Sequence, residues 1–190
     1  SSFSTYRLIF PTVRNASAAN SMQLAELMLF GVENSSPVIS GAGGTLAFQE
    51  NDGATVIDSS LTVADDDDSN IQSATIQITG NYEQNEDVLA FTNANGIEST
   101  WTVGSGTLKL DGPATKAQYE AALESITYNN ISENPNTSNR TVSWIINDGG
   151  SNSSSVTSTI TVARVNDAPT GSVSISGTAA EDQTLTVSNT

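Results

Sequence analysis

Short apolar segments alternate with polar ones along most of the chain, and their period of two residues is that of β-strands. Segment 73–82 (SATIQITGNY) places alanine and isoleucine on one face and threonine and glutamine on the other. Segments 140–148 and 156–165 alternate in the same way, and the NDGGSNSS between them predicts a hairpin. Further short strands are predicted at 46–48, 55–58, 60–64, 88–92, 99–103 and 107–110. Short strands with turn signals about every ten residues predict a β-sandwich.

The period changes once, in the segment DGPATKAQYEAALESI. Thr115 is a predicted N-cap, and Gln118 three residues later completes the pattern of a capping box. Alanine and leucine follow and favour helix, so one short helix is predicted near 115–124. The predicted fold class is therefore all-β: a Greek-key, immunoglobulin-like β-sandwich with one short helix.

Proline and serine divide the chain into four predicted parts. Residues 1–32 hold two apolar runs, YRLIF and MQLAELMLFG; two strands alone cannot bury a shared apolar face, so we expect the C-terminal fragment of a preceding β-sandwich module. Residues 33–37 are a predicted linker, and 38–168 a complete domain. Residues 169–190 repeat the features that open this domain: a proline, a Ser/Gly-rich segment, an acidic residue and an alternating strand. This repetition predicts the start of a following, truncated repeat. We expect the chain to be an excerpt of a longer protein.

The composition restricts the chemistry. Six basic residues face 21 acidic ones, so the formal net charge is −15, and such a field repels nucleic acid and anionic membranes. The chain has no cysteine and no histidine, which excludes disulfides, thiolate chemistry and the commonest general base. No apolar run approaches the ~20 residues of a membrane span. The remaining hard oxygen ligands are those that calcium prefers.

Acidic residues gather where predicted strands end. The segment LTVADDDDSN places four consecutive aspartates after a strand, and Asp66 and Asp68 point to the same side of an extended chain. Asp148 ends another strand in NDGG, and Asp167 lies in VNDAP. A lone acidic run is usually a solvated loop, whereas this arrangement also fits a cation site. The sequence leaves open which of 65–68 would bind, because Asp65 and Asp67 are alternatives.

Several of these features, taken in order, resemble cadherin-like repeats of giant bacterial surface and secreted proteins, including adhesins. They are Glu50 in an early strand, an Asp-x-Asp after a strand, the segment GPATKAQYEAALESITYNN, the NDG and the closing VNDAP. The resemblance covers about 37–169 and implies Ca²⁺ bound where repeats meet. It assigns Asp66, Asp68 and Asp148 to the end facing the preceding module, and Glu50, Asn166 and Asp167 to the other end. The preceding linker departs from the family pattern, because it reads VENSSP. Residues 1–32 resemble the closing strands of a discoidin-like, carbohydrate-binding sandwich.

Two functions follow as expectations. The first is a calcium-stabilised spacer repeat of a multidomain extracellular adhesin. Its expected partners are adjacent repeats of the same chain and, through other domains, glycans or another cell surface. The alternative is a carbohydrate-binding, lectin-like module or an accessory domain of an extracellular glycan-acting protein. Trp144 and Trp101 are both predicted to be core residues rather than sugar platforms. We expect no enzyme activity, no nucleic-acid partner, and an extracellular or cell-surface location in a bacterium.

Overall fold

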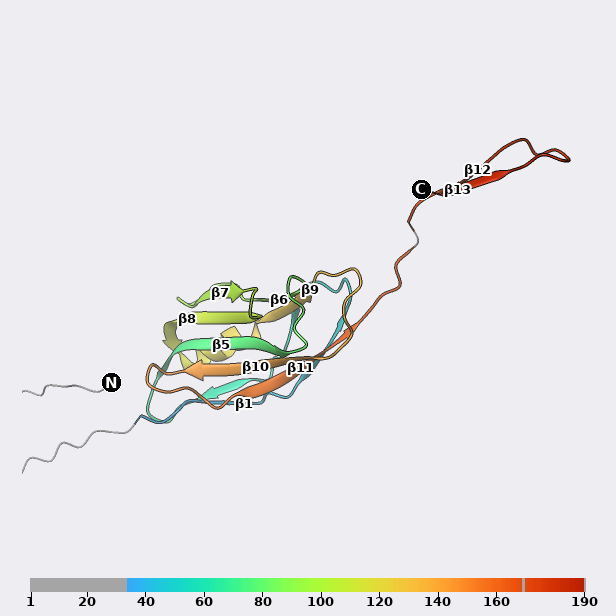
Figure 1. Cartoon of the computed structure of the whole chain (residues 1–190). Coiled ribbons are helices and arrows are strands. Elements are labelled where there is room, and N and C mark those ends of the chain that lie inside the picture. The colour runs from blue at the N-terminus through green and yellow to red at the C-terminus, as the bar shows by residue number, and fades with distance from the viewer. Residues whose placement is uncertain (1–33, 169, 190) are drawn as a thin grey trace, which may run out of the picture.

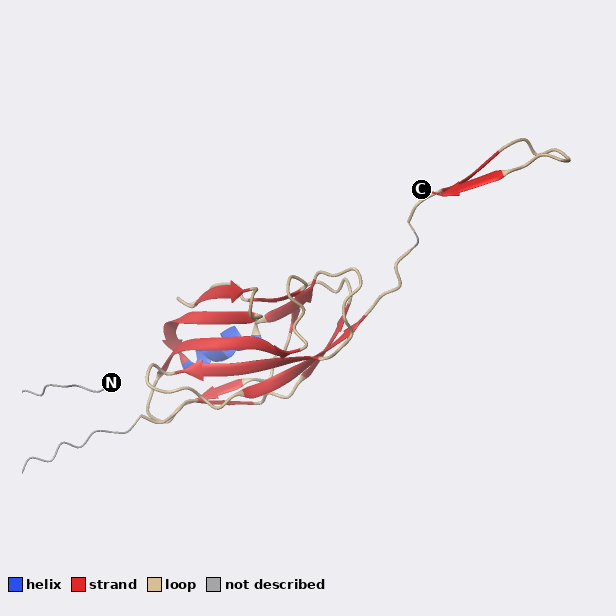
Figure 2. Cartoon of the chain, in the orientation of Figure 1, coloured by secondary structure: helices blue, strands red, loops and turns tan. Residues whose placement is uncertain are grey.

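The computed structural model describes residues 34–168 and 170–189, so the fragment predicted at 1–32 lies outside the described residues (Figure 1). The elements are β1 (Val38–Ser40), β2 (Thr45–Gln49), β3 (Thr55–Val56), β4 (Thr62–Ala64), β5 (Asn70–Gly80), β6 (Asp87–Ala90), β7 (Glu98–Thr102), β8 (Thr107–Thr115), α1 (Lys116–Glu124), β9 (Thr127–Asn130), β10 (Arg140–Asn147), β11 (Val156–Ala163), β12 (Val173–Ser176) and β13 (Thr186–Asn189). Strands dominate the described chain, and α1 is the single helix drawn in Figure 2.

The strands build a sandwich. One sheet has the order β2-β11-β10-β5-β8-β7; β2 pairs with β11 in parallel and all other pairs are antiparallel. The smaller sheets are β3-β9-β6 and β1-β4. Because the chain passes repeatedly from the large sheet to the smaller ones, strands distant in sequence become neighbours. The all-β sandwich is confirmed, and so is the predicted hairpin of β10 and β11, in which Trp144 lies opposite Val156.

The alternating strands place their apolar residues in one core. The inward residues of β5 and β10 are almost completely buried, as the period-two pattern predicts. Trp144 is among them and is 0% exposed, which confirms its prediction as a core residue. Phe48 and Tyr128 join the two layers, with their ring centroids 5.0 Å apart in an edge-to-face contact. Trp101 is half-buried, and its ring makes an edge-to-face contact with the ring of Tyr82.

Helix α1 begins where the sequence predicts it. The Thr115 hydroxyl accepts the backbone N–H of Gln118 at 3.3 Å, and the Gln118 side chain accepts the backbone N–H of Thr115 at 2.9 Å. This reciprocal pair is the predicted capping box. Tyr119, Ala122 and Leu123 form the buried side of the helix.

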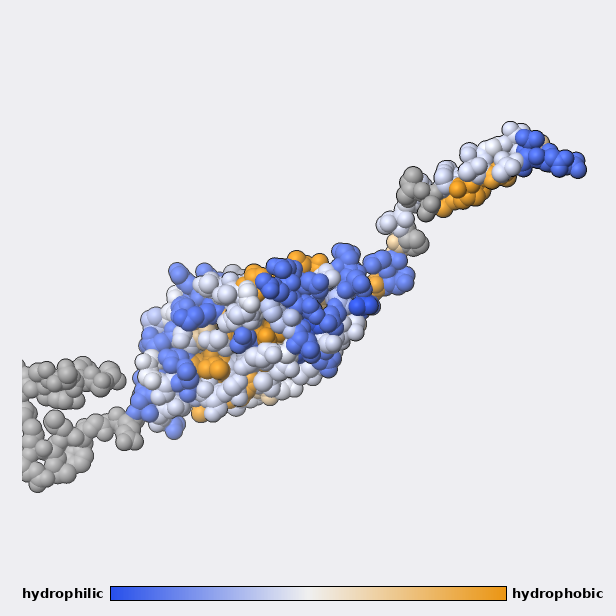
Figure 3. Space-filling view, viewed as in Figure 1, coloured by the Kyte–Doolittle hydropathy of each residue, from blue (hydrophilic) through white to orange (hydrophobic). Residues whose placement is uncertain are grey.

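The β12–β13 hairpin has the register of the β1–β4 pair. Ile39 lies opposite Val63, and Ile175 lies opposite Val187. Both pairs contain the same short sequences. ISG ends the first strand and includes the glycine after it, and LTV begins the second strand and includes the leucine before it. They differ in burial: Ile39 is 5% exposed, whereas Ile175 is 67% exposed. The exposed apolar residues of the hairpin form the orange band in Figure 3.

Candidate metal centres

Acidic side chains gather in two clusters at opposite ends of the sandwich. The amino-terminal cluster consists of Asp65, Asp68 and Asp148, and the carboxy-terminal cluster consists of Glu50, Glu133 and Asp167. In each cluster one carboxylate oxygen from every member lies within 4.8 Å of the others. The clusters are at opposite ends because β10, which leads into the first, runs antiparallel to β11, which leads into the second.

The amino-terminal cluster is built around Asp65, which directly follows β4. Its Oδ1 accepts the backbone N–H groups of Asp67 at 3.1 Å and Asp68 at 2.9 Å, so the acidic run turns back over Asp65 instead of remaining extended. Asp65 is 8% exposed, and its buried Oδ2 has no hydrogen-bond partner. A buried carboxylate oxygen without a partner is costly, and a bound cation would remove that cost.

Asp148 enters the same cluster from the end of β10. Its Oδ1 accepts the N–H groups of Gly150 at 2.6 Å and Ser151 at 2.7 Å, and its Oδ2 accepts the amide of Asn34 at 2.9 Å. Partial burial alone would raise the pKa of Asp148, but these hydrogen bonds hold it below its ordinary value. Asp148 is therefore kept ionised, as a metal ligand must be.

The third member, Asp68, faces its like-charged neighbours. Desolvation, followed by the charges of Asp67, Asp65 and Asp148, raises the pKa of Asp68 above its ordinary value. Repulsion of this kind favours a counter-ion among the carboxylates. Beside Asp68 and Asp148 lies a hollow of about 360 Å³, lined by Asn34, Asp68, Gln72, Asp148, Gly149 and Gly150.

The structure brings together some of the predicted amino-terminal ligands and not others. Asp68 and Asp148 lie in the cluster, whereas Asp66 is exposed and is not a member. The reason is the turn around Asp65, since the spacing argument that selected Asp66 requires an extended chain. Asp65, which the sequence left as an alternative, takes that place. Asp67 instead accepts the backbone N–H of Ser35 in the preceding linker.

The carboxy-terminal cluster is built around Glu50, which directly follows β2. Its backbone N–H donates to Ala163 at 2.8 Å, and its Oε2 accepts the N–H of Val165 at 2.8 Å. Glu50 is 3% exposed, and its buried Oε1 has no partner. Among the described residues, Glu50 Oε1 and Asp65 Oδ2 are the two buried side-chain polar atoms left unsatisfied, so each cluster contains one of them.

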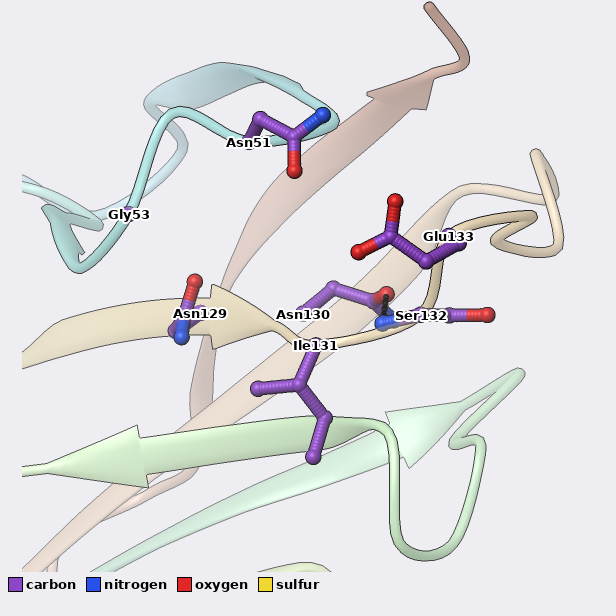
Figure 4. Close-up of a pocket in the computed structure, with 7 residues that line it drawn as sticks. All are labelled: Asn51, Gly53, Asn129, Asn130, Ile131, Ser132 and Glu133. Atoms are coloured by element: carbon purple, nitrogen blue, oxygen red, sulfur yellow. Dashed lines mark hydrogen bonds between the residues drawn. The ribbon is translucent and has the colours of Figure 1, made fainter. Parts of the chain in front are cut away.

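The other members of this cluster come from exposed segments. Asp167 lies in the linker after β11 as predicted, next to Asn166, whose amide donates to the Asp167 carbonyl at 3.2 Å. Glu133 comes from the loop between β9 and β10 and was not predicted. A polar hollow of about 250 Å³ lies beside Glu133 (Figure 4). It is lined by Asn51, Gly53, Asn129, Asn130, Ile131, Ser132 and Glu133.

The geometry of both clusters fits a hard divalent cation. Oxygens that bind one Ca²⁺ at about 2.3–2.6 Å lie at most about 5 Å apart, and the carboxylate oxygens of each cluster meet that limit. Three carboxylates, one of them buried with an unsatisfied oxygen, are a donor set that such an ion would complete.

Comparisons with known proteins show a partial similarity to a much longer protein. No family model matches the chain, and no solved structure matches it. A segment of 86 residues is 34% identical to halomucin from Haloquadratum walsbyi, covering 43% of this chain and 1% of that protein. The chain therefore spans a very small part of this relative, and the cadherin-like resemblance stays a prediction. In the described part of the chain, no helix has the length and apolar character needed to span a membrane.

Proposed function

We propose that residues 34–168 form a calcium-stabilised spacer module of a long extracellular surface protein. The observation that carries the proposal is the placement of the two unsatisfied buried oxygens, Asp65 Oδ2 and Glu50 Oε1, one in each acidic cluster. A cation in each cluster would satisfy that oxygen and neutralise the carboxylates around it. The cations would stabilise the folded state by mass action, because the unfolded chain has no such sites.

Each cluster also contacts a linker, which gives the ions a mechanical role. Asn34 and Ser35 of the preceding linker donate to Asp148 and Asp67. At the other end, Glu50 accepts the N–H of Val165, in the linker that contains Asp167. An ion bound at either end would therefore hold a linker against the sandwich and limit its bending. This is the property that a spacer in a tandem array requires.

A tandem array is supported by the β12–β13 hairpin. Its register and its ISG and LTV sequences match those of β1 and β4, which open the described sandwich. In that sandwich, Ile39 is buried; the equivalent Ile175 is exposed. We infer that the hairpin is the opening strand pair of a second module of the same kind.

Similarity to halomucin supports a place in a very long, surface-associated protein, since the aligned segment is only 1% of that relative. The relative is archaeal, so it gives no support to the expected bacterial origin. We propose an extracellular or cell-surface location, adhesion through other parts of the protein, and no catalytic role. The carbohydrate-binding alternative has less support, because Trp144 is buried and Trp101 packs against Tyr82.

Thermal unfolding tests the proposal. We expect the midpoint to rise by several degrees when EDTA is replaced by ~1–10 mM Ca²⁺, the range of extracellular modules. Mg²⁺ should have a smaller effect. Asp65→Asn and Glu50→Gln should each remove part of the Ca²⁺-dependent rise, and Asp111→Asn, an exposed aspartate outside both clusters, should leave it unchanged. A midpoint that does not respond to Ca²⁺ would refute the proposal.

A further inference from the structure

A buried ion pair lies behind the loop that contributes Glu133. Asp87 opens β6, Arg140 opens β10, and both are 0% exposed. Arg140 Nε donates to Asp87 Oδ2 at 3.0 Å, and Arg140 Nη2 donates to Asp87 Oδ1 at 3.2 Å. Tyr128 Oη and Asn130 Nδ2 donate to Oδ1 at 2.6 Å and 2.7 Å, and the Glu83 backbone N–H donates to Oδ2 at 2.8 Å. A buried carboxylate with this many donors fixes their positions, because any donor that leaves exposes a charge to an apolar interior.

Tyr128 strengthens this arrangement. Burial, and then its hydrogen bond to Asp87, raise the pKa of Tyr128 well above the usual range. The hydroxyl therefore stays protonated and remains a donor to Asp87.

Arg140 extends from this pair into the loop 131–139, between β9 and β10. Its Nη1 donates to the carbonyl oxygens of Asn136 and Ser138, both at 2.6 Å. The guanidinium thus joins Asp87 to two backbone positions downstream of Glu133. A lysine could keep the charge but could not hold all four acceptor atoms, because its ammonium has three donors at one point and lacks the planar fork of the guanidinium.

Asn130 makes the matching connection upstream of Glu133. Its Nδ2 donates to Asp87, and its Oδ1 accepts the backbone N–H of Ser132 at 3.0 Å. Figure 4 shows this bond, with Glu133 following Ser132 at the edge of the hollow. The residue that precedes Glu133 is therefore anchored to the same carboxylate as the residues that follow it.

The loop is also attached to the outgoing linker. Arg164 Nε donates to the carbonyl oxygen of Pro135 at 2.7 Å. The next residue, Val165, donates to Glu50 Oε2. The loop supplies Glu133 and the linker supplies Asp167, and these bonds hold both segments beside Glu50. The carboxylates of Glu133 and Asp167 take no part in them.

We propose that the Asp87–Arg140 pair is a positioning device for the carboxy-terminal cation site. It holds the loop so that the exposed carboxylate of Glu133 meets those of Glu50 and Asp167 before a cation arrives. Without it, binding would carry the entropy cost of ordering the loop. This inference rests on the proposed function, in which these carboxylates bind a cation. The amino-terminal cluster lies at the opposite end of β10 and should be independent of the pair.

The test is a Ca²⁺ titration of the wild type and of Arg140→Lys, in which amide NMR signals report binding at each site. The Val165 N–H reports the carboxy-terminal site because it donates to Glu50, and the Gly150 N–H reports the amino-terminal site because it donates to Asp148. Removing supporting partners of metal ligands typically weakens binding by about 10–100-fold. We expect the dissociation constant read at Val165 to rise by about tenfold or more, and that read at Gly150 to stay the same.

Val142→Ala is the matched control for lost stability. Val142 is a buried residue on the same strand, two positions after Arg140. None of the hydrogen bonds that hold the loop, as described above, involves Val142. Its substitution should lower the free energy of unfolding without changing either dissociation constant. A second readout is amide hydrogen exchange in EDTA, where the Ser132 N–H should exchange faster in Arg140→Lys and not in Val142→Ala.

The outcomes separate the two proposals. If Val165 does not respond to Ca²⁺ in the wild type, the cation site fails and this inference fails with it. If the wild type saturates and Arg140→Lys binds with unchanged affinity, or weakens at both reporters alike, only the positioning role is overturned. If Arg140→Lys does not fold, Asn130→Ala decides by the same readout, because it removes the connection from Asp87 to Ser132 and keeps the two hydrogen bonds between Arg140 and Asp87.

Discussion

The indole of Trp144 and the carboxylate of Asp58 are joined by one hydroxyl group. Trp144 Nε1 donates to Ser158 Oγ at 3.1 Å, and Ser158 Oγ donates to Asp58 Oδ2 at 2.7 Å. Asp58 also accepts the N–H of Gly44 and both the hydroxyl and the N–H of Ser60. These bonds connect the core of the large sheet to the segment between β3 and β4. A buried carboxylate outside both acidic clusters therefore helps to hold the two layers together.

This connection predicts a loss of stability in acid. Burial alone would raise the pKa of Asp58, but the hydrogen bonds from Ser60, Ser158 and Gly44 hold it below its ordinary value of 3.8. The unfolded chain therefore binds this proton more readily than the folded one. The stability that Asp58 contributes is complete above about pH 5 and is lost as the pH falls through the folded-state pKa.

Urea unfolding in EDTA at pH 6 and pH 3 measures this effect. The free energy of unfolding of Asp58→Asn should lie below that of the wild type at pH 6, and the difference should shrink at pH 3. Asp111→Asn is the control, since Asp111 is exposed and its only described ion pair is with Lys109 on the surface. A difference for Asp58→Asn that does not change with pH would contradict the prediction.

The sequence predicted an element correctly where that element depends only on residues within its own segment. The capping box of α1 needs only Thr115 and Gln118, and the alternation of β10 needs only its own residues. Strand β9 was missed because its inward residues are Tyr128 and Asn130, which break the apolar pattern. Those residues face inward to reach Asp87, a partner more than 40 residues away in sequence, so no local pattern could reveal them.

The sequence predicted most of the residues in the two clusters but not all of them. Asp68 and Asp148 lie at the ends of predicted strands, Glu50 and Asp167 were expected from the resemblance, and the structure places each of these four residues in a cluster. The cluster contains Asp65 where the sequence predicted Asp66. The cause is a turn formed by two hydrogen bonds from backbone N–H groups to Asp65, whereas the prediction assumed an extended chain. Glu133 gave no signal in the sequence, because its loop is held by residues whose partners are distant. Arg140 binds the loop and also Asp87, 53 residues away, and Arg164 binds Pro135, 29 residues away.

A further prediction concerns the linker residue Asn34. Its amide donates to Asp148 Oδ2 at 2.9 Å and to Ser151 at 3.2 Å, and Asn34 lines the hollow beside the amino-terminal cluster. Calcium affinity follows the number of charged ligands, so Asn34→Asp should tighten Ca²⁺ binding at the amino-terminal cluster by roughly tenfold. In EDTA the same variant should be less stable than the wild type, because a donor is replaced by a fourth carboxylate.

Amide NMR again separates the two ends of the domain. In Asn34→Asp the Ca²⁺ dissociation constant read at Gly150 should fall, and that read at Val165 should stay the same, which makes the second site an internal control. Asn34→Ala removes the amide without adding charge and should not tighten binding. An unchanged constant at Gly150 in Asn34→Asp would show that position 34 does not reach the ion.

The last prediction compares the two equivalent strand pairs. Ile39→Ser removes a buried side chain and should lower the free energy of unfolding of the sandwich by about 2–5 kcal/mol. Ile175→Ser changes the equivalent position of the β12–β13 hairpin, where the side chain is 67% exposed. This substitution should alter the free energy of unfolding of the sandwich by less than about 0.5 kcal/mol. Urea unfolding of both variants in EDTA measures the difference. Similar losses would show that the apolar face of the hairpin is already covered within this chain, and the inference that it opens a second module would then be wrong.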